Sequence, residues 1–480
     1  MLQIRYGDPG FRYTHHDVGH QISSLAFAAA AQNASVVLLD GLSDGELGAL
    51  LRADAPEDPV CLLALFPADA PPPPGREQDW WRTFTVGEDF WAGAPPPAHH
   101  GAPVEVRSST RGLRVVVISR FSPCLLAMTH SSSRLFPLLE QQVYYGKPEA
   151  AARPIIASAR EAGRRLARVG ADDEGFWSGG APPRALPAAW AASATMPPLR
   201  QLIHERRSAQ SYDADAAPPG GLPAPLFFDI LRRMAAQPAW FPWKPAVQPF
   251  LFVHRVAGLQ PGIYLLCRGM GGAGGGGSGS SSGGGGNSSS SSSSGGGGYS
   301  SSSGSSICDE LRPRLDPRGV HLWQAVPGAP ADMRDLVLLR AADVRDAARL
   351  GSCTQEIASE SAFAVAFLAE HLPALKRHGA WWYKREHWEA CALGGALYLA
   401  AGAAGDTGGG ATLQATGIGC FFAPWVQSFL EVDAPAWADV YHFTMGWPAE
   451  DRRVDVTGDP YAHVDELRGQ DRDTVDSRGQ

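Results

Sequence analysis

The sequence lacks the basic excess that a general nucleic-acid-binding protein needs. Its formal net charge is −8, with 41 Lys and Arg residues against 49 Asp and Glu residues, whereas binding to a phosphate backbone needs a basic face. We therefore expect no nucleic-acid partner. Lysine is especially scarce, which a GC-rich coding sequence would explain, so the preference for arginine is not evidence of phosphate chemistry. The lysines are Lys147, Lys244, Lys376 and Lys384.

Cysteine pairs at metal-binding or disulfide-framework spacing are also missing. The 7 cysteines are an odd number, scattered along the chain without any CxxC pair. We therefore expect neither a disulfide framework nor a zinc site, and we take a reducing compartment as the default. The His-His pairs at 15–16 and 99–100 have no carboxylate or cysteine at ligand spacing. No metal site is predicted.

A signal core and a membrane-spanning run are absent as well. The N-terminal "MLQIRYGDPGFRY" has neither an apolar core nor transit-peptide character. The longest apolar run, "ACALGGALYLAAGAAG" (390–405), is too short and too rich in glycine for a membrane span. We expect it to be a buried helix, and we expect a cytoplasmic protein without membrane contact, an organellar location remaining open.

Three low-complexity stretches divide the chain. "APPPPG" (70–75) and "GAPPPAHHGAP" (93–103) are rich in proline and are predicted to be extended. Residues 269–306 are almost pure Gly and Ser, and such a segment cannot bury enough apolar surface to offset the entropy lost on ordering. We predict a floppy insertion that follows a hairpin, whose strands are expected at 250–256 and 262–268.

Periodicity of the apolar residues predicts helices over 196–207, 226–236, 355–371 and 386–402. A further short helix is expected at "QSFLEVD", before the strand "DVYHFTMG", and "LRVVVISRF" could pair as another strand. Helices mixed with antiparallel hairpins favour an α+β architecture.

An internal repeat links the start of the chain to its C-terminal part. "FRYTHHDVGHQISSLAFAAAA" (11–31) aligns without gaps to "YKREHWEACALGGALYLAAGA" (383–403). Both begin with an aromatic and a basic residue, continue with a histidine (His15, His387) and an acid, and lead into an Ala-rich helix. Ala-rich helices resemble one another by chance, but the matched entry segment favours duplication. Nothing before "YGDPGFRY" corresponds to "HERRSAQSYD" (204–213), so we expect a degenerate first copy or a truncated gene.

The order of the motifs in the second copy carries a resemblance. "LIHERRSAQSYD", "LFFDILRRM", "FLFVHRVAGLQPGIYLL", "TGIGCFF" and "VYHFTMGWPAEDRRVD" resemble, in that order, the nitroreductase-like flavoprotein superfamily. The resemblance is strongest to the branch of SagB-type dehydrogenases with tandem-duplicated relatives, and it covers roughly two thirds of the chain. It implies an α+β fold in which helices flank an antiparallel sheet, with a complete second copy and a partial first copy.

The family binds FMN where two subunits meet, and the resemblance carries the phosphate site onto four residues of this chain. Arg206, Arg207 and Ser208 would contact the phosphate, the ribityl chain and the pyrimidine edge. Arg452, at the end of the last strand, would close the phosphate site. Arginine suits this role because it offers charge-assisted, bidentate donors to a dianion.

The same resemblance implies that Gly417 and Gly419 lie next to the ring of the flavin. Glycine lets the backbone approach a flat ring and offer N–H donors. Such donors near N5 and O2 would stabilise the reduced, more anionic flavin.

Each of these motifs has an ordinary explanation when taken alone. Arg-Arg-Ser is typical of a solvated surface patch or a kinase site, a lone GxG of a turn, and an arginine near the C-terminus of a surface charge. His254, in a hairpin strand, fits a packed or surface histidine better than an acid–base group. Cys353 fits a small core residue better than a helix-start thiol with a lowered pKa. We assign no catalytic acid or base.

The chain also departs from the SagB-type pattern. A Lys-Tyr pair that precedes the central helix in that branch, and is tied to azoline oxidation, is replaced here by Arg377 and His378. Ala423 stands where an acidic residue is often found, and Cys391 where glycine is usual. Flavin binding is compatible with these changes, whereas azoline dehydrogenation is put in doubt.

The predicted organisation is a partial first copy (1–70), a Pro-rich connecting region (71–195), an FMN-binding domain (196–465) interrupted at 269–306, and a polar tail (466–480). We expect an FMN-dependent oxidoreductase that moves two electrons between a reductant and a second acceptor, with NAD(P)H as a candidate donor and a small molecule or peptide as substrate. Because two subunits build each site in the family, either a homodimer or an internal pseudo-dimer is expected. The alternative is a redox-inactive scaffold of the same fold that binds a peptide or a partner protein.

Overall fold

The structure is a computed structural model, and it describes residues 9–51, 61–67, 105–107, 114–118, 158–159, 161–165, 188–190, 196–235, 241–268 and 307–450. The α-helices are α2 (Pro9–Ala30), α3 (Asp44–Leu51), α7 (Leu199–Glu205), α8 (Ala224–Ala235), α9 (Ile307–Leu315), α10 (Arg345–Gly351), α11 (Glu356–Ser359), α12 (His371–His378), α13 (Tyr383–Ala403) and α14 (Ala423–Phe429). The strands are β1 (Ala34–Leu38), β2 (Cys61–Pro67), β3 (Glu105–Arg107), β4 (Arg114–Ile118), β5 (Val247–Val253), β6 (Gly262–Leu266), β7 (Gln324–Ala325), β8 (Leu336–Ala341), β9 (Phe363–Glu370), β10 (Gln414–Ile418) and β11 (Trp437–Gly446).

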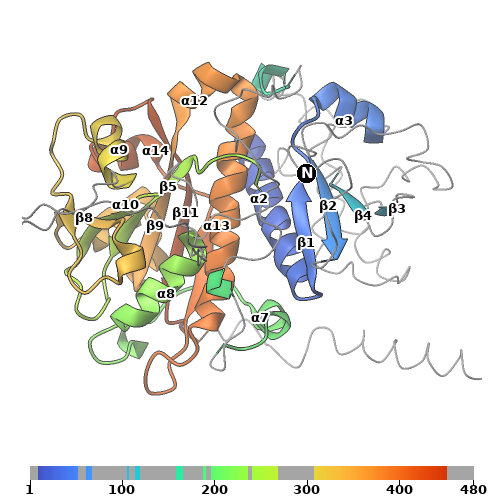
Figure 1. Ribbon diagram of the computed structural model, residues 1–480. Helices are drawn as coiled ribbons and strands as arrows, with labels where there is room; N and C mark the ends of the chain where they lie inside the picture. The colour runs from blue at the N-terminus through green and yellow to red at the C-terminus, as the bar shows by residue number, and fades with distance from the viewer. Residues whose placement is uncertain are drawn as a thin grey trace, which may run out of the picture.

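A seven-stranded antiparallel sheet organises the larger part of the molecule. Its strand order is β10-β11-β9-β5-β6-β8-β7, and every neighbouring pair is antiparallel. Helices lie on both faces: α9, α10 and α14 on one, and α8 and α13 on the other (Figure 1). This arrangement confirms the predicted α+β class. The predicted hairpin is β5 with β6, and the helices predicted at 196–207, 226–236 and 386–402 correspond to α7, α8 and α13.

Strand β9 shows why the helix predicted over 355–371 is wrong. Only the short α11 and the first residue of α12 are helical there, and Phe363–Glu370 is the central strand β9 between β5 and β11. Phe363, Val365 and Phe367 belong to the core under α13, whereas Ala364 and Ala366 belong to the core on the other face. A strand buried on both faces has a continuous apolar run without the alternation that would distinguish it from a buried helix.

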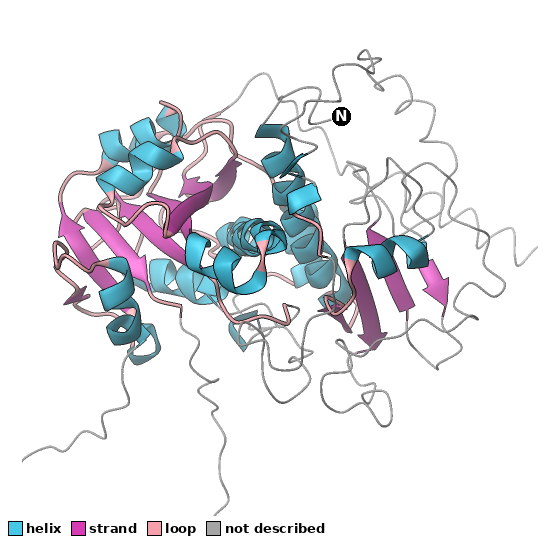
Figure 2. Ribbon diagram, turned by 90° about the horizontal axis from the view of Figure 1, so that it is seen from above, coloured by secondary structure: helices cyan, strands magenta, loops and turns pink. Residues whose placement is uncertain are grey.

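Helix α13 lies between the large sheet and α2, and both views show this arrangement (Figures 1 and 2). The two helices run parallel, and residues that the gap-free alignment matches lie opposite one another. The rings of Phe11 and Tyr383 stack with centroids 6.0 Å apart. A Cβ at Gly19 would lie 2.7 Å from Cβ of Cys391, so only glycine permits this close approach.

A second, four-stranded antiparallel sheet lies beyond α2, with the order β1-β2-β4-β3. Strand β4 lies within "LRVVVISRF", so the predicted pairing of that segment is confirmed. The sheet takes strands from both sides of residue 70. The predicted domain boundaries stay a prediction.

The expectation that the chain has no disulfides is wrong. The structure pairs Cys267 with Cys308 and Cys353 with Cys420, and the Cα–Cα distances are 5.5 and 5.8 Å. Each bond joins residues far apart in sequence, which explains why spacing gave no signal. The Cys267–Cys308 bond joins the residues that flank the Gly/Ser stretch 269–306 in the sequence. That stretch, the tail 466–480 and Arg452 lie outside the described residues.

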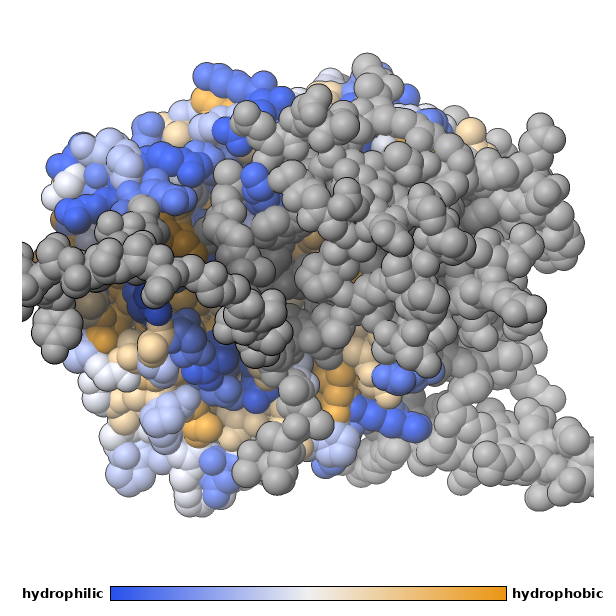
Figure 3. Space-filling model, in the orientation of Figure 1, coloured by the Kyte–Doolittle hydropathy of each residue, from blue (hydrophilic) through white to orange (hydrophobic). Residues whose placement is uncertain are grey.

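No helix in the described part of the chain is long and apolar enough to cross a bilayer. On the face drawn in Figure 3, hydrophilic side chains cover much of the described surface. The exposed large apolar side chains within the described ranges are Val320, Leu322, Leu350 and Phe422. The predicted cytoplasmic location stays a prediction.

Candidate functional site

The segment that contains Arg206, Arg207 and Ser208 lies along the edge strand β10. Ser208 forms a parallel bridge with Ala415, and Ala209 is bonded twice to this strand. Its N–H donates to the Ala415 carbonyl at 3.3 Å, and its carbonyl accepts from the Thr416 hydroxyl at 2.6 Å. The Arg-Arg-Ser segment is therefore held next to the strand of Gly417.

The continuation of the same segment lies beside the end of β11. Tyr212 bridges Pro448, the Asp213 N–H donates to the Trp447 carbonyl at 3.0 Å, and the Ala449 N–H donates to the Ser211 carbonyl at 3.1 Å. The chain that leads to Arg452 thus runs past the segment that begins at Arg206. The described residues end at Glu450, so the role of Arg452 stays a prediction.

The two arginines point to different partners. Arg206 is half-buried, donates to the Ser208 hydroxyl at 3.2 Å and lies over the ring of Tyr398, 5.0 Å from its centroid. Arg207 instead donates to the carbonyls of His204 and Arg206 at 2.8 and 3.0 Å, and so caps the end of α7. No carboxylate of the described residues pairs with Arg206, and its guanidinium is the better placed of the two to receive an anion.

Gly417 and Gly419 are both covered by tyrosine side chains. The Gly417 N–H donates to Tyr398 Oη at 3.0 Å, and a Cβ at Gly417 would overlap Tyr441 Oη. A Cβ at Gly419 would lie 3.2 Å from the ring of Tyr13. Glycine is therefore needed at position 417 to admit the hydroxyl of Tyr441.

Helix α2 completes this cluster with polar side chains. Arg12 Nη2 donates to the Gly419 carbonyl at 3.2 Å, and His20 Nε2 is hydrogen-bonded to Tyr441 Oη at 2.8 Å. Burial, together with the nearby Arg206 charge, lowers the pKa of His20 to about 4. Burial raises the pKa of Tyr441 well above its usual value. His20 is therefore a neutral imidazole at neutral pH, bonded to a protonated phenol.

These residues offer a suitable phosphate site and a crowded ring site to FMN. The guanidinium of Arg206 and the hydroxyl of the exposed Ser208 are donors of the kind that a phosphate takes. The Gly417 N–H, in contrast, is already bound to Tyr398 Oη, and a flavin ring would have to displace that hydroxyl to gain the donor. The phosphate fits, and we derive no chemical step through the ring.

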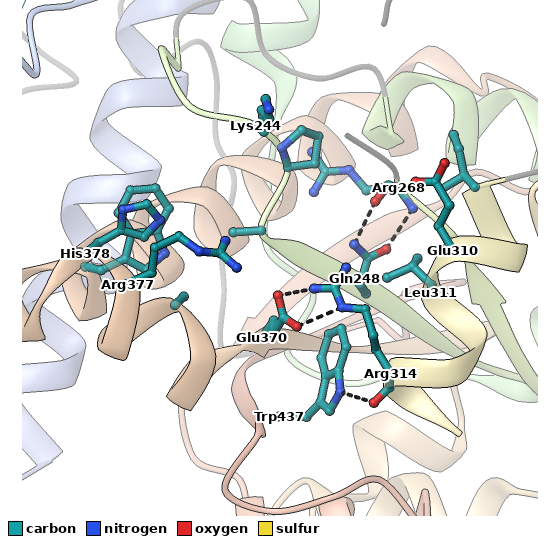
Figure 4. A pocket seen from close by; sticks show the side chains of 15 residues that line it. Lys244, Gln248, Arg268, Glu310, Leu311, Arg314, Glu370, Arg377, His378 and Trp437 are labelled. Carbon is teal, nitrogen blue, oxygen red and sulfur yellow. Dashed lines mark hydrogen bonds and ion pairs between the residues drawn. The ribbon is translucent and has the colours of Figure 1, made fainter. Parts of the chain in front are cut away.

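A separate cavity lies at the other end of the sheet (Figure 4). Its volume is about 60 Å³, and Gln248, Arg314, Glu370 and Trp437 are among its lining residues. Arg314 Nε donates to Glu370 Oε1 at 2.9 Å across it. This volume is small for a flavin, and we assign no flavin to this cavity.

A Ser-His-Asp constellation that spacing did not predict is buried behind the strand that carries Gly417. Ser352 Oγ lies 3.0 Å from His442 Nδ1, and His442 Nε2 lies 2.8 Å from Asp439 Oδ2. The three residues are 2%, 4% and 5% exposed, whereas a nucleophile must reach a substrate. We therefore assign them a packing role. His254 is likewise packed: its Nε2 lies 3.0 Å from the Ala358 carbonyl, and burial lowers its pKa to about 3.

Sequence reasoning missed Tyr398, Tyr441 and His20. Only the repeat alignment pointed to the segment of His20, and nothing local indicated that it would meet a strand near the other end of the chain. Cys353, considered as a core residue or a reactive thiol, is instead half of a disulfide.

Comparison with protein-family models gave no match, and no curated protein matches the chain. Among solved structures, the chain is similar to a protein from Anabaena variabilis that is provisionally assigned as a nitroreductase. That likeness has 16% identity and a TM-score of 0.49, and covers 93% of this chain and 67% of the other. A provisionally assigned nitroreductase from Ralstonia eutropha is similar at 14% identity and a TM-score of 0.29, covering 55% of this chain and 89% of the other.

Proposed function

We propose that the chain is an FMN-dependent oxidoreductase of the nitroreductase-like superfamily, with its flavin site where the segment 206–208 meets strand β10. The observation that carries the proposal is the bridge between Ser208 and Ala415, because it brings together two motifs that the resemblance assigns to one flavin. The proposed reaction moves two electrons from a reductant, for which NADH or NADPH is a candidate, to a second acceptor.

FMN would supply the electron chemistry, and the protein would bind and orient it. Arg206 would neutralise phosphate charge, and Ser208 would donate a hydrogen bond to a phosphate oxygen. Tyr398, whose ring lies under the Arg206 guanidinium, would separate the phosphate from the hydrogen-bonded His20–Tyr441 pair. Arg377 and His378 stand in place of the Lys-Tyr pair, so we do not propose azoline dehydrogenation.

We also propose that the chain is a tandem duplication that provides both halves of its flavin site. The order α2, β1, α3, β2 repeats as α13, β10, α14, β11, and β1 pairs with β2 in the antiparallel manner of β10 and β11. The parallel packing of α2 on α13 supports the same idea. An internal pseudo-dimer is then sufficient, and a homodimer is the alternative.

Only the second copy is expected to hold a flavin. The last residues of the five-residue strands β1 and β10 are Leu38 and Ile418, so Val37 and Leu39 stand where the second copy has Gly417 and Gly419. Neither position holds a glycine, the residue that permits a close backbone approach. We therefore expect one FMN per chain.

A redox-inactive scaffold remains the second candidate, and the crowding at Gly417 favours it. Tyr398 Oη occupies the Gly417 N–H, and Tyr441 Oη fills the space in front of the α-carbon. In this case the cluster would be a packed core, and the surface would bind a peptide or a partner protein.

Titration of the full-length protein with FMN distinguishes the two candidates. Arg206→Ala should weaken binding by about 10- to 100-fold, the equivalent of one charge-assisted hydrogen bond. Arg200→Ala is the matched control, because Arg200 is an exposed arginine on the neighbouring helix α7. Weak binding that is equal in wild type and both variants would support the scaffold instead.

A further inference from the structure

The small cavity at the end of the large sheet lies apart from the proposed flavin site (Figure 4). Trp437, which lines the cavity, begins strand β11 and pairs with Glu370 at the end of β9. Gly417 pairs with Phe443, farther along β11. Positions 437 and 443 are about 20 Å apart along the strand, so the cavity is a separate site.

Much of the cavity wall is fixed by hydrogen bonds. The side-chain amide of Gln248 is bonded twice to the backbone of Arg268, both times at 2.7 Å. Arg268 Nη1 donates to Glu389 Oε1 at 2.6 Å, and Arg314 Nε donates to Glu370 Oε1 at 2.9 Å. The charges of Arg268 and Arg314 are therefore already balanced by carboxylates.

Two other cations of the wall have no such balance. Lys244, just before β5, and Arg377, on α12, both line the cavity, and within the ranges that the structure describes neither forms an ion pair. Figure 4 shows the guanidinium of Arg377 extending from α12 toward Glu370. Of the described residues that line the cavity, Glu310 is the one remaining acid, and it is exposed. Two cations against one carboxylate leave a local excess of one positive charge, in a chain whose net charge is −8.

The cavity also has an apolar part. Leu311, Ala374 and Trp437 line it, and all three are buried. The volume is about 60 Å³, whereas an engineered cavity of about 150 Å³ holds benzene. An occupant is therefore smaller than benzene, or it is one end of a larger molecule, and its carbon atoms would meet these apolar side chains.

The charges of the wall select among small anions. Arginine and lysine donate charge-assisted hydrogen bonds to a carboxylate. One negative charge matches the local excess of one positive charge, whereas the carboxylates of Glu310 and Glu370 would repel a second one. A sulfate or phosphate dianion also has no carbon atoms to place against Leu311 and Ala374.

We propose that this cavity is a binding site for a short monocarboxylate such as propionate. The carboxylate accepts hydrogen bonds from the ammonium of Lys244 and the guanidinium of Arg377. The hydrocarbon part packs against Leu311, Ala374 and Trp437. The site does not depend on a bound flavin.

The test titrates the full-length protein with sodium propionate and follows binding by saturation-transfer difference NMR. Lys244→Gln and Arg377→Gln each remove one cation. Lys376→Gln is the matched control, because Lys376 is exposed, precedes Arg377 on α12 and does not line the cavity. Sodium sulfate, a dianion of similar size, is the competitor. Urea denaturation of each variant checks that it folds.

We expect saturable binding of propionate to wild type with a dissociation constant of about 1 mM. Lys244→Gln and Arg377→Gln should each weaken binding by about 10-fold or more, and Lys376→Gln should leave it unchanged. Sulfate should bind at least about 10-fold more weakly than propionate, because the wall carboxylates repel its second charge.

The absence of saturable binding to wild type, or an equal affinity of wild type and Arg377→Gln, overturns the proposal. An equal loss in Lys376→Gln overturns it as well, because general surface charge would then explain the binding. Sulfate that binds more tightly than propionate overturns the assignment to a monocarboxylate. Arg377 is exposed, so its variant decides the matter even if Lys244→Gln fails to fold.

Discussion

The hydroxyl of Tyr441 lies 2.8 Å from His20 Nε2, and this single contact joins residues 421 positions apart in the chain. The same hydroxyl fills the space in front of the Gly417 α-carbon. One oxygen therefore brings together strand β11, helix α2 and the edge strand of the proposed flavin site.

Gly417→Ala should lower the free energy of unfolding by about 1–3 kcal/mol, because the new methyl group overlaps Tyr441 Oη and breaks its bond to the half-buried His20. Urea denaturation measures this loss. Gly45→Ala is the control, since a Cβ there meets nothing within 4 Å. If Gly417→Ala unfolds at the wild-type urea concentration, the Tyr441 hydroxyl does not occupy that space.

The protein should lose stability as the pH falls from 7 to 5. Burial lowers the pKa of His20 to about 4 and the pKa values of His254 and His387 to about 3. The unfolded chain protonates these imidazoles near 6.5, so below that pH it binds more protons than the folded protein does. Burial raises the pKa values of Asp17 and Glu386 to about 6, and these carboxyls oppose the trend because their contribution to stability is lost as the pH rises.

The three histidines should outweigh the two carboxyls, since their shifts are larger. Free energies of unfolding at pH 7, 6 and 5 test the sign. His20→Gln, which cannot titrate, should reduce the slope. A stability that is constant or increases on acidification would show that the imidazoles are not held neutral by burial.

Removal of the buried Asp40 carboxylate should lower the free energy of unfolding far more than removal of an exposed carboxylate. Arg385 Nε donates to Asp40 Oδ2 at 3.1 Å, and the Asp40, Arg165 and Arg385 side chains are 4%, 5% and 2% exposed. Asp40→Ala leaves two buried guanidinium groups without this partner and should cost about 3–5 kcal/mol.

Asp343→Ala is the matched control for Asp40→Ala. Asp343 pairs with Arg345, and both side chains are about half exposed, so the loss should be about 1 kcal/mol or less. Equal losses in the two variants, measured by urea denaturation, would contradict a buried ion pair at Asp40.

Chymotrypsin should cut the native protein at Tyr299 without separating the fragments. Tyr299 is the one aromatic residue in the Gly/Ser stretch 269–306, whose composition predicts a cleavable insertion. The Cys267–Cys308 bond should hold the fragments together on a non-reducing gel and release them on a reducing one. In Cys267→Ser/Cys308→Ser the fragments should separate on both gels. Resistance of Tyr299 to cleavage would contradict the predicted insertion.

The sequence by itself determined the local elements that have a long continuous pattern or are bounded by clear turn residues. Helix α13 follows from its long Ala-rich pattern, and the β5–β6 hairpin from two apolar runs around a Gly/Pro turn. The repeat alignment also identified the segments that become α2 and α13. Each of these helices is formed by one continuous stretch of the chain, so its pattern can be read locally. These features need no distant partner to be recognised.

The tertiary structure alone decided what each segment is packed against. Strand β9 is a strand because two neighbours pair with its backbone and helices cover both its faces, although its apolar run has no period of its own. The disulfide partner of Cys353 and the partner of His20 depend on chain segments folded together from far away. Local patterns carry no information on such distances, since burial and pairing exist only once the sheet and the two central helices are assembled.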